Sequence, residues 1–321
     1  RLNYGITKTF TITYIEARSK KLETKSIESV GNVSFYKNAN KMHSLPLDKY
    51  YYYHLKENEK YNYKQVDSLT GILTIHTFNM GSETTNGHKQ YQRFLDSVFV
   101  DVKINKIKNL IVDVRNNGGG TDPNDLITYS YLTIRNFQEN KEAWICFKKI
   151  PLLKYIYHKV PSFIRPLFIG KFNKEFQQIF PQEKNGKFYQ DENSDDHKIR
   201  KPNQNAFNGN IYLLISPKIA SAGSLFAAML AGNENTITIG EETMGSYYGH
   251  NGHTPLEYKL PKSKIIIQFS VVNLEQDVSQ KENQKYDRGI IPDYSITQTF
   301  GDFLNNTDTQ INFTLELIKT K

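Results

Sequence analysis

A serine in a turn of small residues is the first candidate for chemistry in this sequence. Ser221 ends the segment SPKIAS (216–221), which lies between an apolar run at 211–215 and a predicted helix from about residue 222 to 230. Small residues allow a serine to occupy a sharp turn at a helix start, with its hydroxyl exposed and the next backbone N–H free. Serine is also a favoured helix N-cap, so this segment alone indicates either a nucleophile or a cap.

A glycine turn provides the second candidate. The segment NNGGG (116–120) follows the apolar strand predicted over 110–114, so its N–H groups are expected at the same sheet edge as Ser221. Two unpaired N–H groups from different loops are what an oxyanion hole requires. Glycine-rich turns also bind phosphates, but no GK[ST] sequence follows here, which disfavours a nucleotide loop. The remaining alternative is an ordinary tight turn.

The elements around these turns predict an α/β fold. Residues 71–78 alternate like a half-buried strand, and apolar residues at helical spacing follow over 91–102. After the glycine turn, Asp122 and Pro123 favour the start of another helix. This order of strand, helix, strand, glycine turn and helix is typical of a layered α/β domain.

The composition narrows the function. With 38% hydrophobic and 23% charged residues in 321, the chain is ordinary globular material. Its single cysteine, Cys146, excludes an internal disulfide and CxxC zinc sites, and no histidines stand in HxH or HExxH spacing. We therefore predict no metal and no cofactor, and we expect no nucleic-acid partner.

Four segments together resemble a known family, the tail-specific (C-terminal processing) serine peptidases. The segments, in the family's order, are VDVRNNGGG (112–120), ASAGSLFAA (220–228), GEET (240–243) and GIIPD (289–293). The resemblance covers roughly residues 70–135 and 207–300. It implies a crotonase-like (Clp-protease-like) layered core of ββα units. It also implies peptide-bond hydrolysis outside the cytoplasm, in a periplasmic, outer-membrane-attached or secreted protein.

The catalytic base departs from the processing branch of that family. That branch uses a lysine at the position of Ser246, and no lysine lies within several residues of it. A helix dipole cannot by itself activate a serine hydroxyl, so a base is needed. The tricorn-like branch uses a histidine on the strand that opens the core, and the resemblance places His76 there. His250 and His253, beside the expected lysine position, are the rival bases.

The other site residues also follow from the resemblance. An acid that orients the histidine is expected shortly before GIIPD, and Asp287 is chosen over Glu282, with Tyr286 at the closest matching position. The predicted oxyanion donors are the N–H groups of Ala222 and Gly119. Relatives often have proline at the position before Gly119, and proline has no N–H to donate.

The chain is expected to have two parts. Residues 1–66 form a β-rich N-terminal segment, which could be the remainder of a longer region, and 67–321 form the peptidase core. The PDZ domain usual in the processing branch is expected to be absent, truncated or outside this chain, because only about 66 residues precede the core. A helical insertion over 135–208 interrupts the core as a lid or partner surface, with a mobile polar loop over 192–205.

Charge gathers in the insertion. Residues 139–175 carry eight basic and three acidic side chains, with aromatic residues between them. Such a segment indicates either a solvated lysine-rich surface or an anionic neighbour, such as a membrane surface or an acidic peptide end. The oligomeric state stays open.

The sequence therefore predicts a serine endopeptidase that acts on polypeptides. The first alternative is a non-catalytic ligand- or peptide-binding protein on the same scaffold, as in retinoid-carrying relatives. A further alternative is acyl-CoA chemistry, which the crotonase-like core suggests but which does not need Ser221.

Overall fold

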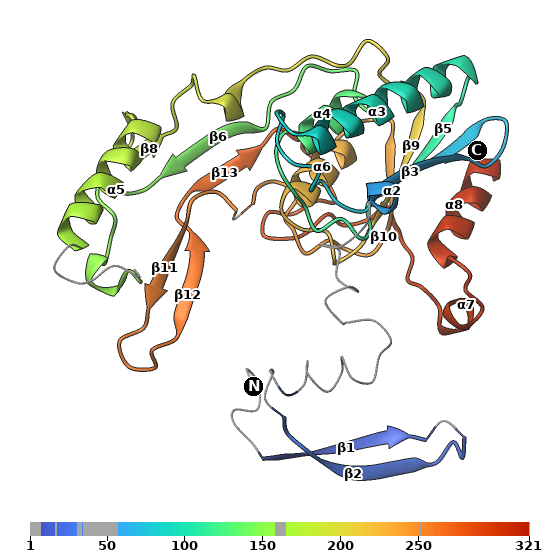
Figure 1. The fold of residues 1–321 in the computed structure, drawn as a ribbon, viewed down its shortest axis with the longest axis horizontal. Helices are drawn as coiled ribbons and strands as arrows, with labels where there is room; N and C mark the ends of the chain where they lie inside the picture. Colours follow the sequence, from blue (N-terminus) through green and yellow to red (C-terminus); the bar gives the residue numbers. More distant parts are fainter. Residues whose placement is uncertain are drawn as a thin grey trace. The chain divides into compact units, whose positions relative to one another are not determined.

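The computed structural model describes residues 8–16, 18–30, 34, 57–157, 165–250 and 252–320. The chain forms two compact units, Arg1–Leu55 and Lys56–Lys321. In the first unit, β1 (Thr9–Ile15) and β2 (Leu22–Glu28) form an antiparallel hairpin, drawn in dark blue in Figure 1. The predicted lead-in over 1–66 extends past this unit, because its last strand pairs within the sheet of the second unit.

A six-stranded sheet forms the centre of the second unit (Figure 1). Its order is β14-β10-β9-β5-β4-β3, and every neighbouring pair is parallel except β3 with β4. The carboxyl ends of β4, β5 and β9 therefore meet at one edge, where both the glycine turn and the serine turn begin. The strands are β3 (Tyr61–Gln65), β4 (Thr70–Ile75), β5 (Asn109–Asp113), β9 (Asn210–Ile215), β10 (Thr236–Gly240) and β14 (Tyr294–Ser295).

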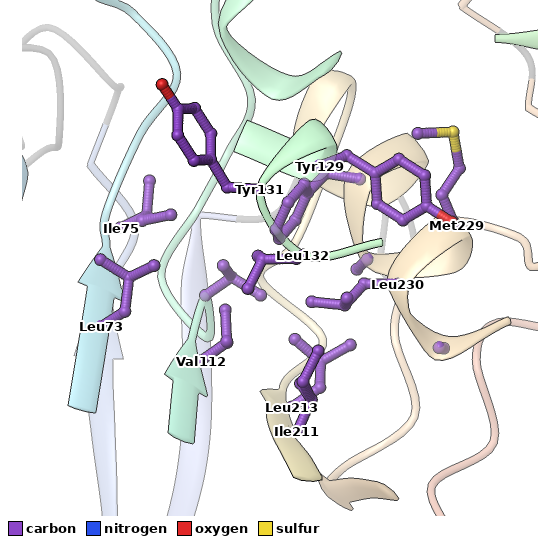
Figure 2. Packing of buried hydrophobic residues seen from close by; sticks show 14 of the residues in the cluster. Leu73, Ile75, Val112, Tyr129, Tyr131, Leu132, Ile211, Leu213, Met229 and Leu230 are labelled. Atoms are coloured by element: carbon purple, nitrogen blue, oxygen red, sulfur yellow. The ribbon is translucent and has the colours of Figure 1, made fainter. Parts of the chain in front are cut away.

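Three helices cover one face of this sheet. They are α3 (Asn86–Ile104), α4 (Asn124–Ser130) and α6 (Ala222–Ala231). Alternate strand residues such as Leu73, Val112 and Leu213 pack beneath them in the main core, as Figure 2 shows. Every residue of α6 is buried, which explains why this helix is apolar on all sides.

The other strand residues face α8 (Thr309–Thr320), the predicted closing helix. Ile72, Ile111 and Leu214 form a second cluster with partly buried residues of α8, including Ile311. A short helix, α7 (Phe300–Leu304), precedes α8. Helices thus lie on both faces of the sheet, and the predicted layered α/β core is confirmed.

The insertion is not purely helical. Its strand β6 lies in a four-stranded antiparallel sheet of order β13-β6-β8-β7, and its helix α5 packs beside it. We call this part the second lobe. Its elements are β6 (Asn140–Ile145), η3 (Leu153–Tyr155), α5 (Arg165–Ile179), β7 (Gln182–Lys184), β8 (Lys187–Tyr189), η4 (Asp195–His197), β11 (Pro255–Lys259), β12 (Ile266–Ser270) and β13 (Asn273–Gln276).

The second lobe has its own hydrophobic core. Ile145, Phe176 and Phe180 of the insertion pack there with Leu256 and Leu274, which come much later in the chain. Residues 158–164 of the insertion lie outside the described residues. The polar stretch 192–205, expected to be a mobile loop, contains η4 and is tied by backbone hydrogen bonds to residues 130 and 137. Within the described ranges, no helix has the length and apolar character needed to cross a bilayer.

Candidate active site

The serine turn joins β9 to α6 in a strained conformation. Ser221 has φ 52° and ψ −133°, which is unusual for a residue with a side chain. It stands at the N-cap position, but its side chain accepts no capping hydrogen bond. Its exposed position on a sharp strand-to-helix turn therefore fits a nucleophile better than a cap.

The glycine turn touches the serine turn directly. A Cβ atom placed on Gly119 would lie 2.7 Å from Ser221 Cβ and 2.9 Å from the carbonyl oxygen of Ala220. Gly119 also has φ +101°, a backbone conformation that glycine adopts without strain. The two motifs, about a hundred residues apart in the chain, thus meet at the sheet edge as the sequence predicts.

Asn117 holds three segments of this edge together. Its fully buried side chain donates from Nδ2 to the carbonyl oxygen of Ile75 (3.2 Å) and accepts at Oδ1 from the N–H of Gly119 (2.9 Å). Its own carbonyl oxygen accepts a hydrogen bond from the N–H of Ala220 (3.2 Å). The sequence showed Asn117 only as part of a motif, and its positioning role depends on contacts that no spacing reveals.

The two predicted oxyanion donors differ in their present bonding. The N–H of Ala222 opens α6, and among the described residues it has no hydrogen-bond partner. The N–H of Gly119 donates to Asn117 Oδ1. The N–H of Gly118, one residue earlier on the exposed side of the turn, has no partner in the described part of the chain.

His76 follows β4 at the same edge. Its backbone N–H donates to the carbonyl oxygen of Lys60 (2.8 Å), and its ring is partly buried. Burial lowers the pKa of His76; the carboxylate of Asp113 opposes this shift and the guanidinium of Arg115 adds to it. The imidazole is therefore neutral at pH 7, the form that a general base needs. Its ring forms no hydrogen bond with another described residue.

An ion-pair network fixes the charges beside His76. Arg115 donates to Asp113 from Nε (2.9 Å) and Nη2 (2.7 Å), and to Asp308 from both Nη atoms (2.9 and 2.7 Å). It also donates to Gln310 (2.8 Å). Because Asp308 and Gln310 lie at the start of α8, this network fastens that helix to the end of β5.

The rival histidines lie beside the second lobe. His253 Nε2 is 3.6 Å from Asp196 Oδ2, an interaction that lowers the pKa of Asp196. Burial lowers the pKa of His250 to about 4, with His253 adding to the shift and Asp196 opposing it. His250 is thus neutral at pH 7, while His253 has a carboxylate that orients it.

Two carboxylates with raised pKa values interact with Asp122, which follows the glycine turn. Burial, followed by repulsion from Asp122, raises the pKa of Asp125 to about 7. Burial, followed by repulsion from Asp196, Asp125 and Asp122, raises the pKa of Glu139 to about 8. Perturbed titratable groups concentrate at functional sites. Among the described residues, no group of three or more His, Cys, Asp or Glu side chains is arranged to hold a metal ion.

A cavity of about 660 Å³ opens beside this cluster. Asp122 and Pro123, just after the glycine turn, form one wall, and Glu83 before α3 forms another. Lys198 and Arg200 of the insertion complete it. The insertion therefore lines a cavity next to the glycine turn.

The predicted orienting acid lies on the surface. Asp287 is exposed with φ 63°, and it acts electrostatically on Arg288. Arg288 Nε donates to Glu242 (2.7 Å). No hydrogen bond joins Asp287 to a histidine within the described ranges. Of its competitors, Glu282 is exposed and the ring of Tyr286 stacks on Tyr248 at 4.5 Å.

The last two motifs of the resemblance bind each other. Glu242 accepts from the N–H of Gly289 (3.1 Å), and Thr243 Oγ1 accepts from that of Ile290 (2.8 Å). Asp293 accepts from the N–H (2.8 Å) and hydroxyl (2.9 Å) of Thr238 in β10. These contacts give both motifs a structural role in holding the segment after β10.

The segment that would carry the family's lysine lies against α6. A Cβ atom on Gly245 would lie 2.0 Å from Ser224 Oγ, so Ser246 follows a close contact with the first turn of the helix. The structure places a partly buried lysine, Lys281, beside nearby Tyr248. The Tyr248 hydroxyl accepts a hydrogen bond from the backbone N–H of Lys281 (3.1 Å) and donates one to its carbonyl oxygen (3.3 Å). Burial lowers the pKa of Lys281, opposed by Asp293.

The family model for peptidase family S41 matches residues 69–296. The chain belongs to this family and is a serine-type peptidase, which acts on polypeptides. The match begins just before β4 and ends just after β14, so it covers every strand of the sheet except β3, together with both turns and the second lobe. A comparison with curated proteins gives no match.

Solved structures share the fold at low identity. A peptidase candidate from Parabacteroides merdae ATCC 43184 is 17% identical with a TM-score of 0.50, and the match covers 97% of this chain and 77% of that one. A mutant of CPAF is 12% identical with a TM-score of 0.50, over 91% of this chain. The chain spans 64% of that CPAF structure, less than two thirds of its length.

Proposed function

We propose that this chain is a serine endopeptidase with Ser221 as its nucleophile. The observation that supports this best is the contact between Gly119 and Ser221, because it brings a strained, exposed serine beside a turn rich in backbone N–H groups. Because the Ser221 side chain makes no capping hydrogen bond, this residue does not stabilise the start of α6. Strain of this kind is typical of functional sites.

In the proposed reaction, Ser221 Oγ attacks the carbonyl carbon of the scissile peptide bond and gives its proton to a histidine. His76 is the proposed base, because burial keeps its imidazole neutral and able to take that proton. The C–N bond then breaks, the leaving amine takes the proton, and water hydrolyses the acyl-enzyme by the same route. The role of Asp287 as the orienting acid stays a prediction. It requires the turn that contains Asp287 to approach the histidine.

The tetrahedral intermediate carries a negative oxygen that needs N–H donors. We propose Ala222 and Gly119 for this role, in keeping with the N–H of Ala222 at the start of α6, which has no partner in the described ranges. The N–H of Gly119 would share its hydrogen with Asn117 Oδ1 and the oxyanion. Preorganised donors of this type stabilise the intermediate without having to reorganise during the reaction.

The insertion is proposed to bind the polypeptide. It contributes Lys198 and Arg200 to the cavity beside the glycine turn, where Asp122 supplies the opposite charge. An extended peptide in this cavity would approach Ser221 along the glycine turn. We further propose that the protein works outside the cytoplasm on a crotonase-like core, as the resemblance implies.

A fluorophosphonate probe tests the nucleophile. We expect it to label the wild-type protein at Ser221 and to leave Ser221→Ala unlabelled. Separate His76→Ala, His250→Ala and His253→Ala variants then identify the base, because labelling falls sharply only when the base is removed. A folded wild-type protein that resists labelling would instead support a non-catalytic binding protein. Mass spectrometry of a digested unfolded protein shows whether the cuts are internal.

A further inference from the structure

The hairpin β11–β12 carries apolar side chains that the core of the second lobe does not cover. Leu256 and Tyr258 of β11 pack into the core of the second lobe. The next strand, β12, instead has every residue from Ile266 to Phe269 exposed. Figure 1 shows the hairpin in orange, reaching past the four-stranded sheet of the second lobe.

The exposed apolar residues lie along one strand and its turn, with Ile266 beside Lys259 on one face of the hairpin and Phe269 stacked on Tyr258 on the other. Ile265 is 57% exposed, Ile266 43% and Phe269 46%. Ile267 and Leu260 are exposed as well, and Leu152 projects from the adjoining strap 151–157. That strap is fixed to β11 by the hydrogen bond from the N–H of Tyr157 to the carbonyl oxygen of Glu257 (2.8 Å). We call these side chains, together with Lys154, Lys259, Lys262 and Lys264, the hairpin surface.

Lysines surround this apolar strand. Lys262 and Lys264 lie in the turn, Lys259 ends β11, and Lys154 comes from the strap. Within the described ranges, none of the four forms an ion pair. Glu257 is the single acidic residue between 252 and 270. The hairpin surface therefore combines aliphatic side chains with a net positive charge.

The outer edge of β12 adds a further constraint. Strand β12 pairs with β11 alone among the described strands, so its other edge presents backbone N–H and C=O groups. Exposed edges are usually protected by charged residues within the strand, yet β12 reads IIQFS and has none. Unpaired backbone groups are too costly for the hydrocarbon centre of a bilayer, but water and lipid headgroups can satisfy them at the interface.

We propose that the hairpin surface docks this protein on an anionic lipid bilayer. The lysines meet the negative headgroups, while Ile265 and Ile266, at the turn end of the hairpin, enter the boundary between headgroups and acyl chains. Both contributions are known for interfacial protein segments, which bind through buried apolar area and through attraction to anionic lipids. The charge is complementary to such a membrane, and the unpaired edge limits the hairpin to interfacial depth.

Vesicle sedimentation tests this proposal directly. We expect the wild-type chain to bind vesicles of phosphatidylcholine with phosphatidylglycerol, to bind phosphatidylcholine vesicles weakly, and to dissociate in high salt. The double variant Lys262→Glu with Lys264→Glu removes two lysines, each contributing roughly fivefold in affinity, so binding should fall at least about 20-fold. Ile266→Asp should weaken binding to the phosphatidylglycerol-containing vesicles at low salt.

Matched controls come from α3 in the main core. Lys89→Glu with Lys103→Glu makes the same change of charge on the exposed side of this helix, and Ile104→Asp replaces an isoleucine that is 69% exposed, against 43% for Ile266. These variants should bind vesicles like the wild type, and fluorophosphonate labelling should be unchanged in every variant. The docking proposal and the proposed catalysis are therefore tested independently.

Three outcomes would overturn the docking proposal. The first is a wild-type protein that does not bind anionic vesicles. The second is an equal loss of binding in the α3 controls, which would mean that only overall charge matters. The third is a dimer in sedimentation velocity that Ile266→Asp dissociates, without vesicle binding, because the hairpin surface would then bind a second copy of the chain.

Discussion

Gly119 lies so close to Ser221 that no side chain fits between them: an added Cβ would be 2.7 Å from the serine Cβ. Gly119→Ala therefore combines this clash with an unfavourable φ of +101°. Alanine keeps the backbone N–H, but the clash and the strain must move this donor, so we expect kcat/KM to fall by at least about 100-fold, as it does when an oxyanion donor is removed. Gly118→Ala is the matched control, because a Cβ there meets nothing within 4 Å and the turn need not move. Equal kcat/KM values for the two variants would mean that Gly119 has no role in catalysis.

Asn117 should matter for both stability and rate. Asn117→Ala leaves the buried carbonyl oxygen of Ile75 and the N–H of Gly119 without their partner, at a cost of about 2–3 kcal/mol in the free energy of unfolding. Asn117→Asp can still accept from Gly119 but cannot donate to Ile75. We therefore expect Asn117→Asp to recover more of the kcat that Asn117→Ala loses than of its free energy of unfolding. Steady-state kinetics and a urea titration of both variants measure the two quantities. Identical kcat losses in the two variants would argue against a role in positioning Gly119.

The pH profile of kcat/KM should report the base. Because burial lowers the pKa of His76, the acid limb should fall below pH 6.5, the ordinary histidine value. Arg115 lowers this pKa further, so Arg115→Gln should move the limb to higher pH. Asp113→Asn should move it the other way, because the carboxylate raises the pKa. A limb that neither variant moves would assign the base to another residue.

Glu139 should make stability depend on pH. Its pKa rises from 4.5 to about 8 on folding, so the folded protein holds a proton that the unfolded chain has lost at intermediate pH. The contribution is fully present below pH 4.5 and is lost as pH rises through about 8. Glu139→Gln should remove this dependence and stabilise the protein near pH 8. Thermal unfolding from pH 4.5 to 8.5 measures it, with the exposed Glu142→Gln as control.

The sequence predicted the sheet edge better than the chemistry at that edge. Apolar strands, small-residue turns and helical spacing are local signals, and they placed β9, α6 and the contact of the glycine turn with Ser221. The charged groups that shift the pKa of His76, in contrast, lie at and just after the end of β5. One of them, Arg115, also binds Asp308 before α8, almost two hundred residues away. Side-chain contacts of this kind leave no periodic trace in a sequence. The choice among His76, His250 and His253 therefore stays a prediction.

The insertion shows the same limit. Its prolines and lysines suggested helical pieces and a mobile polar loop, but the residues that complete its sheet and core lie after β10. Asp196 illustrates this, because its proximity to His253 depends on two segments separated by an entire βαβ unit. Local composition could describe the surface of this region but not what it packs against.

The shared core of the second lobe has a consequence for protein engineering. A truncation that deletes residues 135–208 would strip Leu256, Tyr258, Val272 and Leu274 of their packing partners and leave them facing water. A shortened enzyme would therefore need both stretches, 135–208 and about 250–276, to be excised or replaced together. The same reasoning implies that chimaeras between family members should exchange the two stretches as one cassette.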